Sequence, residues 1–241
     1  MNNLKDKKVG RLVAEDYRYA DVFRKYGIDF CCGGGVSVEE VCRKKGLDHR
    51  EVTNALVRIT TDFKPTLNYD NWRLDRLTDH IITMHHQYVR ENLPLLVFYS
   101  AKVANAHGVA HPETVEIKRL VEELEDELLP HMEKEEVVLF PYIKKIMASA
   151  GQMQHLDPVN YGTIENPIKC MISEHEAAGD LMEMIARLSS GYTPPEGACN
   201  TYRVLYKKLQ EFERDLHQHI HLENNILFLK VIAMAGEQAS V

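Results

Sequence analysis

Apolar side chains recur along most of this 241-residue chain with the spacing of amphipathic helices, and no stretch keeps the alternation typical of a strand. From Trp72 onward the spacing predicts four long helices. They cover about residues 72–106, 113–149, 166–190 and 197–235, with Asn166 and Pro167 as the start of the third. Helix-breaking stretches lie between them at 107–112, around 151–162 and at 191–195. Because short connections join antiparallel neighbours, we expect an all-α, up-and-down four-helix bundle.

The first 61 residues carry shorter helical patterns, such as Val9 to Tyr26 and Val38 to Lys45, on either side of the turn-forming run Gly33-Gly34-Gly35. Residues 62–71 lose the helical spacing and contain Pro, Asn and Asp. We therefore predict a small helical domain over 1–61, a linker over 62–71 and the bundle over 72–241.

A pair of histidine and glutamate side chains occurs twice in the bundle. His131-Met-Glu-Lys-Glu135 is repeated as His219-Ile-His-Leu-Glu223, and Leu-Phe follows four residues after each glutamate. Four residues return to nearly the same helix face after a climb of roughly 6 Å, so an imidazole and a carboxylate at this spacing can meet at one ion. Since His86 precedes His131 by 45 residues and His175 precedes His219 by 44, each half of the bundle supplies the same set.

Helical register indicates which histidines face inward. His219 shares its face with apolar residues such as Leu216, whereas His217 and His221 share theirs with polar residues and are expected to point outward. His86 is preferred over His85 because it continues an apolar stripe. The predicted metal ligands are His86, His131, Glu135, His175, His219 and Glu223. Their acidic neighbours Glu133, Glu136, Glu174 and Glu176 could tune or relay the metal, but most of them are interpreted as a solvated helix face.

Taken singly, an inward histidine is more often a hydrogen-bonded core residue than a ligand, and a His-x-x-x-Glu pair is more often a surface pair. Their joint occurrence favours a dinuclear metal site, because burial of unpaired carboxylates would be costly without cations. Imidazole and carboxylate donors suit iron, manganese or zinc, and the absence of thiolate argues against a structural zinc. We predict two iron ions joined by an oxo or hydroxo bridge, with positions left for a small ligand.

Cys31 and Cys32 lie immediately before the glycine run, where an exposed dithiol is plausible. We expect them to act as transfer or redox thiols toward a metal, a partner thiol or a nitrosyl-bearing species, with thiolate character raised if the glycine N–H groups point at the sulfurs. Cys42, Cys170 and Cys199 are as readily explained as inert side chains.

Composition limits the classes of binding partner and the cellular compartment that we expect. The net charge is −7 and no basic block stands out, so we expect no nucleic-acid partner. The longest apolar runs are short and the first residues lack a signal-peptide pattern, so we expect no membrane segment. Five cysteines without a regular framework fit a reducing compartment, which predicts a cytoplasmic protein.

Several motifs together resemble the Repair of Iron Centers family of bacterial di-iron proteins. They are Phe23-Arg24-Lys25-Tyr26 through Cys31-Cys32-Gly33-Gly34, Asp79-His80 through His86, His131 to Pro141, Ser173-Glu174-His175 to Gly179, and His219 to Asn225. The resemblance implies a hemerythrin-like bundle after a Cys-Cys domain, iron ligands at the six positions named above, and both glutamates bridging. It also implies a cytoplasmic, homodimeric factor that restores iron-sulfur proteins damaged by oxidative or nitrosative stress, by iron release. Pro130, beside His131, departs from a regular helix pattern.

Three functions stay open on the sequence, and whether the protein is an enzyme depends on which one holds. The first is iron delivery to damaged clusters. The second is reduction of nitric oxide or peroxide at the di-iron centre. The third, an oxygen-binding or sensing module, ranks last because an oxygen carrier needs an additional histidine, for which only His80 and His85 are nearby.

Overall fold

The computed structural model describes residues 4–16, 18–60, 68–149 and 163–238. Within these residues the regular structure is helical, and Lys8 and Ser37 form an isolated bridge without any strand. The chain divides into two compact units, one of Met1–Leu77 with Gln218–Val241 and the other of Thr78–His217. Among the helices described, none combines the length and apolar character needed to span a membrane.

The four predicted long segments are present, and three of them contain a π-helical section. In chain order the helices are α5 (Leu74–His80), η3 (Ile81–His86), α6 (Gln87–His107), α7 (Glu113–Lys134), η4 (Glu135–Leu139), α8 (Phe140–Ser149), α9 (Glu165–Leu188), α10 (Asn200–Leu222), η5 (Glu223–Leu227) and α11 (Phe228–Gln238). Helix α9 begins at Glu165 after Ile164 and has no side-chain cap, so the predicted cap at Asn166 was wrong by two residues. Proline is tolerated there because the first helical N–H groups need no helical acceptor. The predicted break at 151–162 lies outside the described residues.

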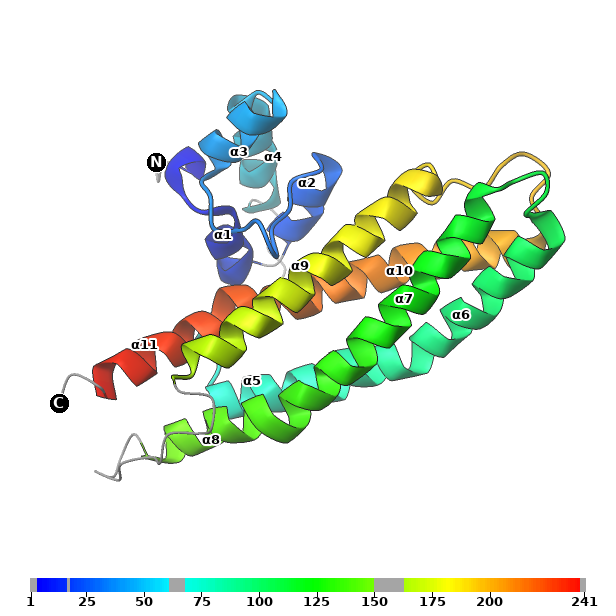
Figure 1. Ribbon diagram of the computed structural model, residues 1–241. Coiled ribbons are helices and arrows are strands. Elements are labelled where there is room, and N and C mark those ends of the chain that lie inside the picture. The colour runs from blue at the N-terminus through cyan, green and yellow to red at the C-terminus, as the bar shows by residue number, and fades with distance from the viewer. Residues whose placement is uncertain (1–3, 17, 61–67, 150–162, 239–241) are drawn as a thin grey trace. The chain divides into compact units, whose positions relative to one another are not determined.

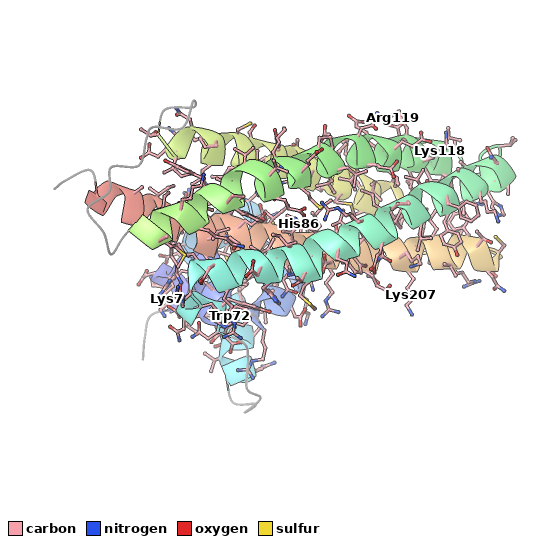
Figure 2. All side chains as sticks on the ribbon, turned by 90° about the horizontal axis from the view of Figure 1, so that it is seen from below. Lys7, Trp72, His86, Lys118, Arg119 and Lys207 are labelled. Atoms are coloured by element: carbon pink, nitrogen blue, oxygen red, sulfur yellow. The ribbon has the colours of Figure 1, made fainter. Side chains whose placement is uncertain are left out.

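The unit Thr78–His217 is a four-helix bundle, which confirms the predicted fold class (Figure 1). Helix α6 packs along α7, and α7 packs along α9. Helix α10 joins α6 where the rings of Tyr88 and Phe212 lie 6.2 Å apart, and Lys208 donates to Asn92. Apolar side chains such as Leu93 and Leu124 are fully buried between the helices. Figure 2 shows Lys118, Arg119 and Lys207 on the outside of the bundle, with His86 among the helices.

The π-helical sections coincide with predicted ligands. His86 is the last residue of η3, Glu135 is the first of η4, and Glu223 is the first of η5. A π-helical turn admits an additional residue and rotates the side chains beyond it, and such turns are frequent at functional sites. Helix α7 continues through Pro130 to Lys134, so the departure from regular helix begins at Glu135 and not at the proline.

The other unit contains four short helices and the end of the chain. They are α1 (Val9–Glu15), α2 (Tyr19–Lys25), α3 (Val38–Lys45) and α4 (His49–Thr60), with the short turns η1 (Leu4–Asp6) and η2 (Tyr69–Asn71). The predicted helix from Val9 to Tyr26 is divided because Asp16 is extended and accepts hydrogen bonds from the backbone and guanidinium of Arg18. Helix α3 has the predicted bounds. Most of the predicted linker, 62–71, lies outside the described residues, and the domain boundaries stay a prediction.

The glycine run after the cysteines packs closely against α1. The backbone N–H of Gly10 donates to the Gly34 carbonyl at 2.8 Å. A Cβ on Gly34 would lie 2.5 Å from the Phe30 carbonyl oxygen and 2.9 Å from the Gly10 Cα, whereas a Cβ on Gly35 would meet nothing within 4 Å. Helix α1 also packs against η5, so this contact joins the glycine run to the end of the chain.

We predict that Gly34→Ala destabilises the Cys-Cys unit by about 1–3 kcal/mol, because backbone atoms cannot move aside for the added methyl group. Gly35→Ala is the matched control and is expected to change stability little. Thermal unfolding followed by circular dichroism measures both. Equal melting temperatures for the two variants would show that the close approach at Gly34 does not matter.

Candidate metal centre

Four of the predicted ligands converge inside the unit Thr78–His217. Glu135 and His86 are 0% exposed, His175 is 1% and His131 is 2% exposed. Glu135 Oε2 lies 3.3 Å from His86 Nε2 and 3.5 Å from His131 Nε2, and the Nε2 atoms of His131 and His175 are 2.9 Å apart. Three helical segments of the bundle therefore point imidazole nitrogens at one buried region around a carboxylate.

The outer nitrogens of two of these imidazoles are held by carboxylates. His86 Nδ1 lies 2.7 Å from Glu136 Oε1, and His131 Nδ1 lies 2.8 Å from Glu174 Oε2. A carboxylate accepts the proton of Nδ1, which leaves the Nε2 lone pair of a neutral ring directed at the buried region. This pairing is typical of histidines that bind metals, because it fixes the ring and strengthens the nitrogen donor.

The interpretation of the four acidic neighbours as mainly a solvated face was therefore correct for two of them. Glu133 and Glu176 are exposed, whereas Glu136 and Glu174 are partly buried and orient the imidazoles. The sequence named all four as residues that could tune the metal but could not single out Glu136 and Glu174, whose long side chains reach inward from partly buried positions. Adjacency to a predicted ligand does not separate these two glutamates from the others, because Glu176 also adjoins His175 and is exposed.

Cations at the surface keep both orienting carboxylates ionised. Burial raises the pKa of Glu136, but hydrogen bonds from Arg90 and His86 outweigh it and the pKa is lowered overall. For Glu174, burial is likewise outweighed by hydrogen bonds from Lys134, His131 and Cys170, so its pKa is also lowered. Each buried imidazole is thus connected to solvent through a carboxylate and a basic side chain.

The remaining predicted pair lies in the other unit. His219 and Glu223 are 1% and 0% exposed, and His219 Nε2 lies 3.1 Å from Glu223 Oε1. In both repeats, then, the histidine and the glutamate face each other across one helical turn. The geometry expected from the four-residue spacing is present twice.

The donor set fits divalent cations. A fully buried carboxylate such as Glu135 is costly to ionise unless a positive charge lies beside it. A metal ion supplies such a charge while binding the Nε2 lone pairs. Imidazole and carboxylate donors without thiolate suit iron, manganese or zinc.

The prediction that His221 points outward was wrong, because this side chain is only 1% exposed. The Cys-Cys segment covers this face of α10: the Phe30 ring meets the His221 ring edge-on at 5.8 Å, and Asn225 Nδ2 lies 3.3 Å from His221 Nδ1. Burial lowers the pKa of His221 to about 4, so the ring is neutral. His217 is partly exposed.

His85 is also buried, with its Nδ1 3.0 Å from Asp215 Oδ1. Neither buried group of potential metal ligands found among the described residues includes it, and neither includes His80. The choice of His86 over His85 for the cluster around Glu135 agrees with this geometry.

The cysteine pair is less exposed than predicted. Cys31 is 4% exposed and Cys32 is half-buried. The Asp29 carboxylate accepts hydrogen bonds from the backbone N–H groups of Cys31, Cys32 and Gly33, so the Gly33 N–H does not serve the sulfurs. The hydrogen bond with Cys32, burial and the charge of Asp29 raise the pKa of the Cys31 thiol well above its usual value. The condition stated for raised thiolate character is therefore not met at Gly33, and the role of the cysteine pair stays a prediction.

Each of the two parts of the chain matches a known protein family. Residues 5–60 match ScdA_N, a domain of unknown function (DUF542), and residues 77–231 match the hemerythrin HHE cation binding domain. The iron-sulfur cluster repair protein ScdA of Staphylococcus haemolyticus is 33% identical over 92% of this chain and 96% of its own length. The iron-sulfur cluster repair protein YtfE of Enterobacter is 36% identical over 97% and 99%, respectively.

The chain belongs to the iron-sulfur cluster repair family. A probable iron-sulfur cluster repair protein of Haemophilus influenzae, 37% identical over 88% of this chain, is a further relative. The resemblance inferred from the motifs is thereby confirmed. All six predicted ligands fall inside the one hemerythrin HHE match, and Cys31 and Cys32 fall inside the amino-terminal match that family members share.

Asn225 fastens the Cys-Cys segment to the end of the chain, since its Nδ2 donates to the carbonyls of Cys31 at 2.8 Å and Phe30 at 3.3 Å. We predict that Asn225→Ala speeds alkylation of Cys31 several-fold in the metal-free protein, because the segment loses both bonds. Asn224→Ala is the matched control. Peptide mapping by mass spectrometry separates Cys31 from the exposed Cys170 and Cys199. An unchanged Cys31 rate in a folded Asn225→Ala protein would contradict this role.

Proposed function

We propose that this protein is a di-iron factor that repairs iron-sulfur clusters damaged by oxidative or nitrosative stress, and that it does so by donating iron. The relatives carry that repair function in their names. One observation supports iron binding. The Glu135 carboxylate is fully buried beside imidazoles, and carboxylates hydrogen-bond to the outer nitrogens of two of those imidazoles. Such a site binds cations and has no evident use without them.

For the ligands we propose His86, His131, Glu135, His175, His219 and Glu223, with both glutamates bridging. The internal repeat supports this set, because each half of one hemerythrin match offers a lone histidine and a facing His-Glu pair. Bound iron would be the ion that the protein passes to a damaged cluster. Two ferrous ions bring four positive charges, and Glu135, Glu223, Glu136 and Glu174 together bring four negative charges.

We further propose damaged iron-sulfur proteins as the partners, a cytoplasmic location and a homodimer. The five cysteines are free thiols, which suits a reducing compartment. The homodimer follows from the family resemblance alone.

Reduction of nitric oxide or peroxide is the second candidate function. Four imidazoles and two bridging carboxylates leave coordination positions on two octahedral ions unfilled, with room for an oxo or hydroxo bridge and a small ligand. An oxygen-binding or sensing role ranks third, because the nearby His85 is engaged with Asp215.

Metal analysis of anaerobically purified protein tests the ligand set. We predict two irons per chain in the wild type and loss of both in Glu135→Ala and in Glu223→Ala, since each carboxylate bridges the pair. Glu133→Ala removes an exposed carboxylate one turn from the site and should retain both irons. Retention of two irons by either bridging variant would exclude the proposed role of that residue.

Iron transfer tests the function itself. Reduced, iron-loaded protein is mixed with a metal-free acceptor of a four-iron cluster in the presence of sulfide, and recovery of the acceptor is compared with loss of iron from the donor. We predict that recovery matches the iron lost. Iron that stays bound, together with catalytic consumption of nitric oxide, would favour the second candidate and reject donation.

A further inference from the structure

One end of the unit Thr78–His217 gathers reactive side chains that the metal centre does not use. Figure 1 shows this end, where α6 turns into α7 and the chain that follows α9 enters α10. His107 is the last residue of α6, and Cys199 directly precedes α10. Although 92 positions separate the two residues in the chain, His107 Nε2 lies 3.2 Å from Cys199 Sγ. At this distance the imidazole can accept the proton of the thiol.

A buried tyrosine supports the His107 imidazole. The ring of His107 meets the ring of Tyr202 edge-on, with 5.5 Å between the ring centroids, and Tyr202 is 1% exposed. The hydroxyl groups of Tyr202 and Tyr206 are hydrogen-bonded at 3.2 Å. Burial raises the pKa of the Tyr202 phenol above its usual value, so this phenol keeps its proton. The imidazole of His107 is therefore the base beside the thiol.

A second histidine at the same end of the bundle is engaged elsewhere. His111 Nδ1 lies 3.1 Å from Glu113 Oε1, and the His111 ring meets the Tyr202 ring edge-on at 5.9 Å. Within the part of the chain that the structure describes, the Cys199 thiol is hydrogen-bonded with His107 and not with His111. The two histidines thus differ in their contact with the thiol and share their contact with the tyrosine.

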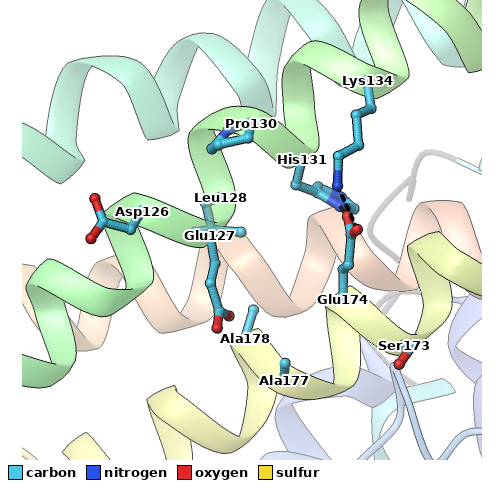
Figure 3. Close-up of a pocket in the computed structure, with 10 residues that line it drawn as sticks. All are labelled: Asp126, Glu127, Leu128, Pro130, His131, Lys134, Ser173, Glu174, Ala177 and Ala178. Carbon is cyan, nitrogen blue, oxygen red and sulfur yellow. Dashed lines mark hydrogen bonds and ion pairs between the residues drawn. The ribbon is translucent and has the colours of Figure 1, made fainter.

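The other exposed cysteine, Cys170, has an acidic neighbour instead of a basic one. Its thiol donates to the carboxylate of Glu174 at 3.4 Å, and Figure 3 shows the same carboxylate bonded to Lys134 and His131. Burial and Glu174 raise the pKa of the Cys170 thiol, because a carboxylate disfavours a thiolate beside it. The two exposed thiols therefore have opposite surroundings, and only Cys199 has a base to accept its proton.

A cation lies one helical turn beyond Cys199. Arg203 is exposed, and its Nε donates at 3.1 Å to the carbonyl of Ala198, the residue that precedes the cysteine. This hydrogen bond keeps the guanidinium near the thiol. Since a guanidinium binds carboxylates through parallel hydrogen bonds, the surface beside Cys199 suits a small molecule that carries a carboxylate.

We propose that Cys199 is a site of thiol–disulfide exchange with small disulfides that carry carboxylates. His107 accepts the proton of the thiol, and the thiolate attacks one sulfur of the disulfide, so that a new S–S bond forms as the old one breaks. The leaving thiolate takes the proton from His107, and no electron carrier is needed. The product is a mixed disulfide that protects Cys199 from irreversible oxidation. The inference involves no metal ion and does not depend on the proposed repair function.

The rate of mixed-disulfide formation in the wild-type protein tests this directly. Reduced, full-length protein is mixed anaerobically with oxidised glutathione and quenched with acid, and peptide mapping by mass spectrometry gives the rate at each cysteine. We predict that Cys199 reacts at least about tenfold faster than Cys170, because only Cys199 has an imidazole that accepts its proton. Equal rates at the two exposed cysteines, or a faster rate at Cys170, would overturn the proposal.

A pair of histidine variants tests the role of the base. His107→Gln removes the proton acceptor and should slow exchange at Cys199 roughly tenfold. His111→Gln is the matched control and should leave this rate unchanged. Circular dichroism of both variants confirms that they are folded. A wild-type rate in folded His107→Gln, or equal slowing by the two variants, would refute the role of His107.

Recognition of the carboxylate is tested with two disulfides of opposite charge. Arg203→Gln should slow exchange with oxidised glutathione several-fold and should not slow exchange with cystamine, which carries amines in place of carboxylates. Lys207→Gln removes an exposed cation one turn farther along α10 and should change both rates little. Equal slowing of both disulfides by Arg203→Gln, or slowing of neither, would exclude carboxylate recognition by Arg203.

Discussion

Burial of the Glu135 carboxylate is the constraint on which the rest of the structure depends. A charge at 0% exposure requires compensation, and its nearest neighbours are imidazoles whose Nδ1 atoms lie against Glu136 and Glu174. Cations that bind these nitrogens and the carboxylate together remove the electrostatic cost. The same ions give a reason for the π-helical turns, since η4 places Glu135 at its first residue.

The carboxylates that hydrogen-bond to the ligand histidines influence how firmly those histidines would hold an ion. Glu136 and Glu174 each have one end at a buried imidazole and the other at a basic side chain near solvent. The hydrogen bond that orients each buried imidazole therefore depends on a basic side chain at the surface. Such a side chain can move without disturbing the core. The difference between Arg90 and Lys134 makes the two arrangements chemically unequal.

Much of this architecture was predictable because it depends on local spacing. The apolar stripes gave the four long helices to within a few residues, and the four-residue repeat placed His131 toward Glu135 and His219 toward Glu223. What depends on distant parts of the chain was not predictable. His221 lies on a polar face of its own helix, and its ring is covered by Phe30, which lies 191 residues earlier in the chain. Likewise, the π-helical turns and the reach of Glu174 have no counterpart in the periodicity.

The Cys-Cys segment does not provide the condition under which raised thiolate character was expected, because the Gly33 N–H donates to Asp29. Asp29 takes the backbone N–H groups that would have stabilised a thiolate, and Asn225 fixes the segment to the end of the chain. Cys31 is therefore kept as a protected thiol in this state.

The central claim is that cations occupy the space around Glu135. Diffraction at the iron absorption edge from crystals of the iron-loaded protein tests it most directly. The account predicts two anomalous peaks about 3.5–4 Å apart, as in other two-metal sites, with the Glu135 carboxylate between them. A map with no peak beside Glu135, or with a single peak remote from it, would contradict the account.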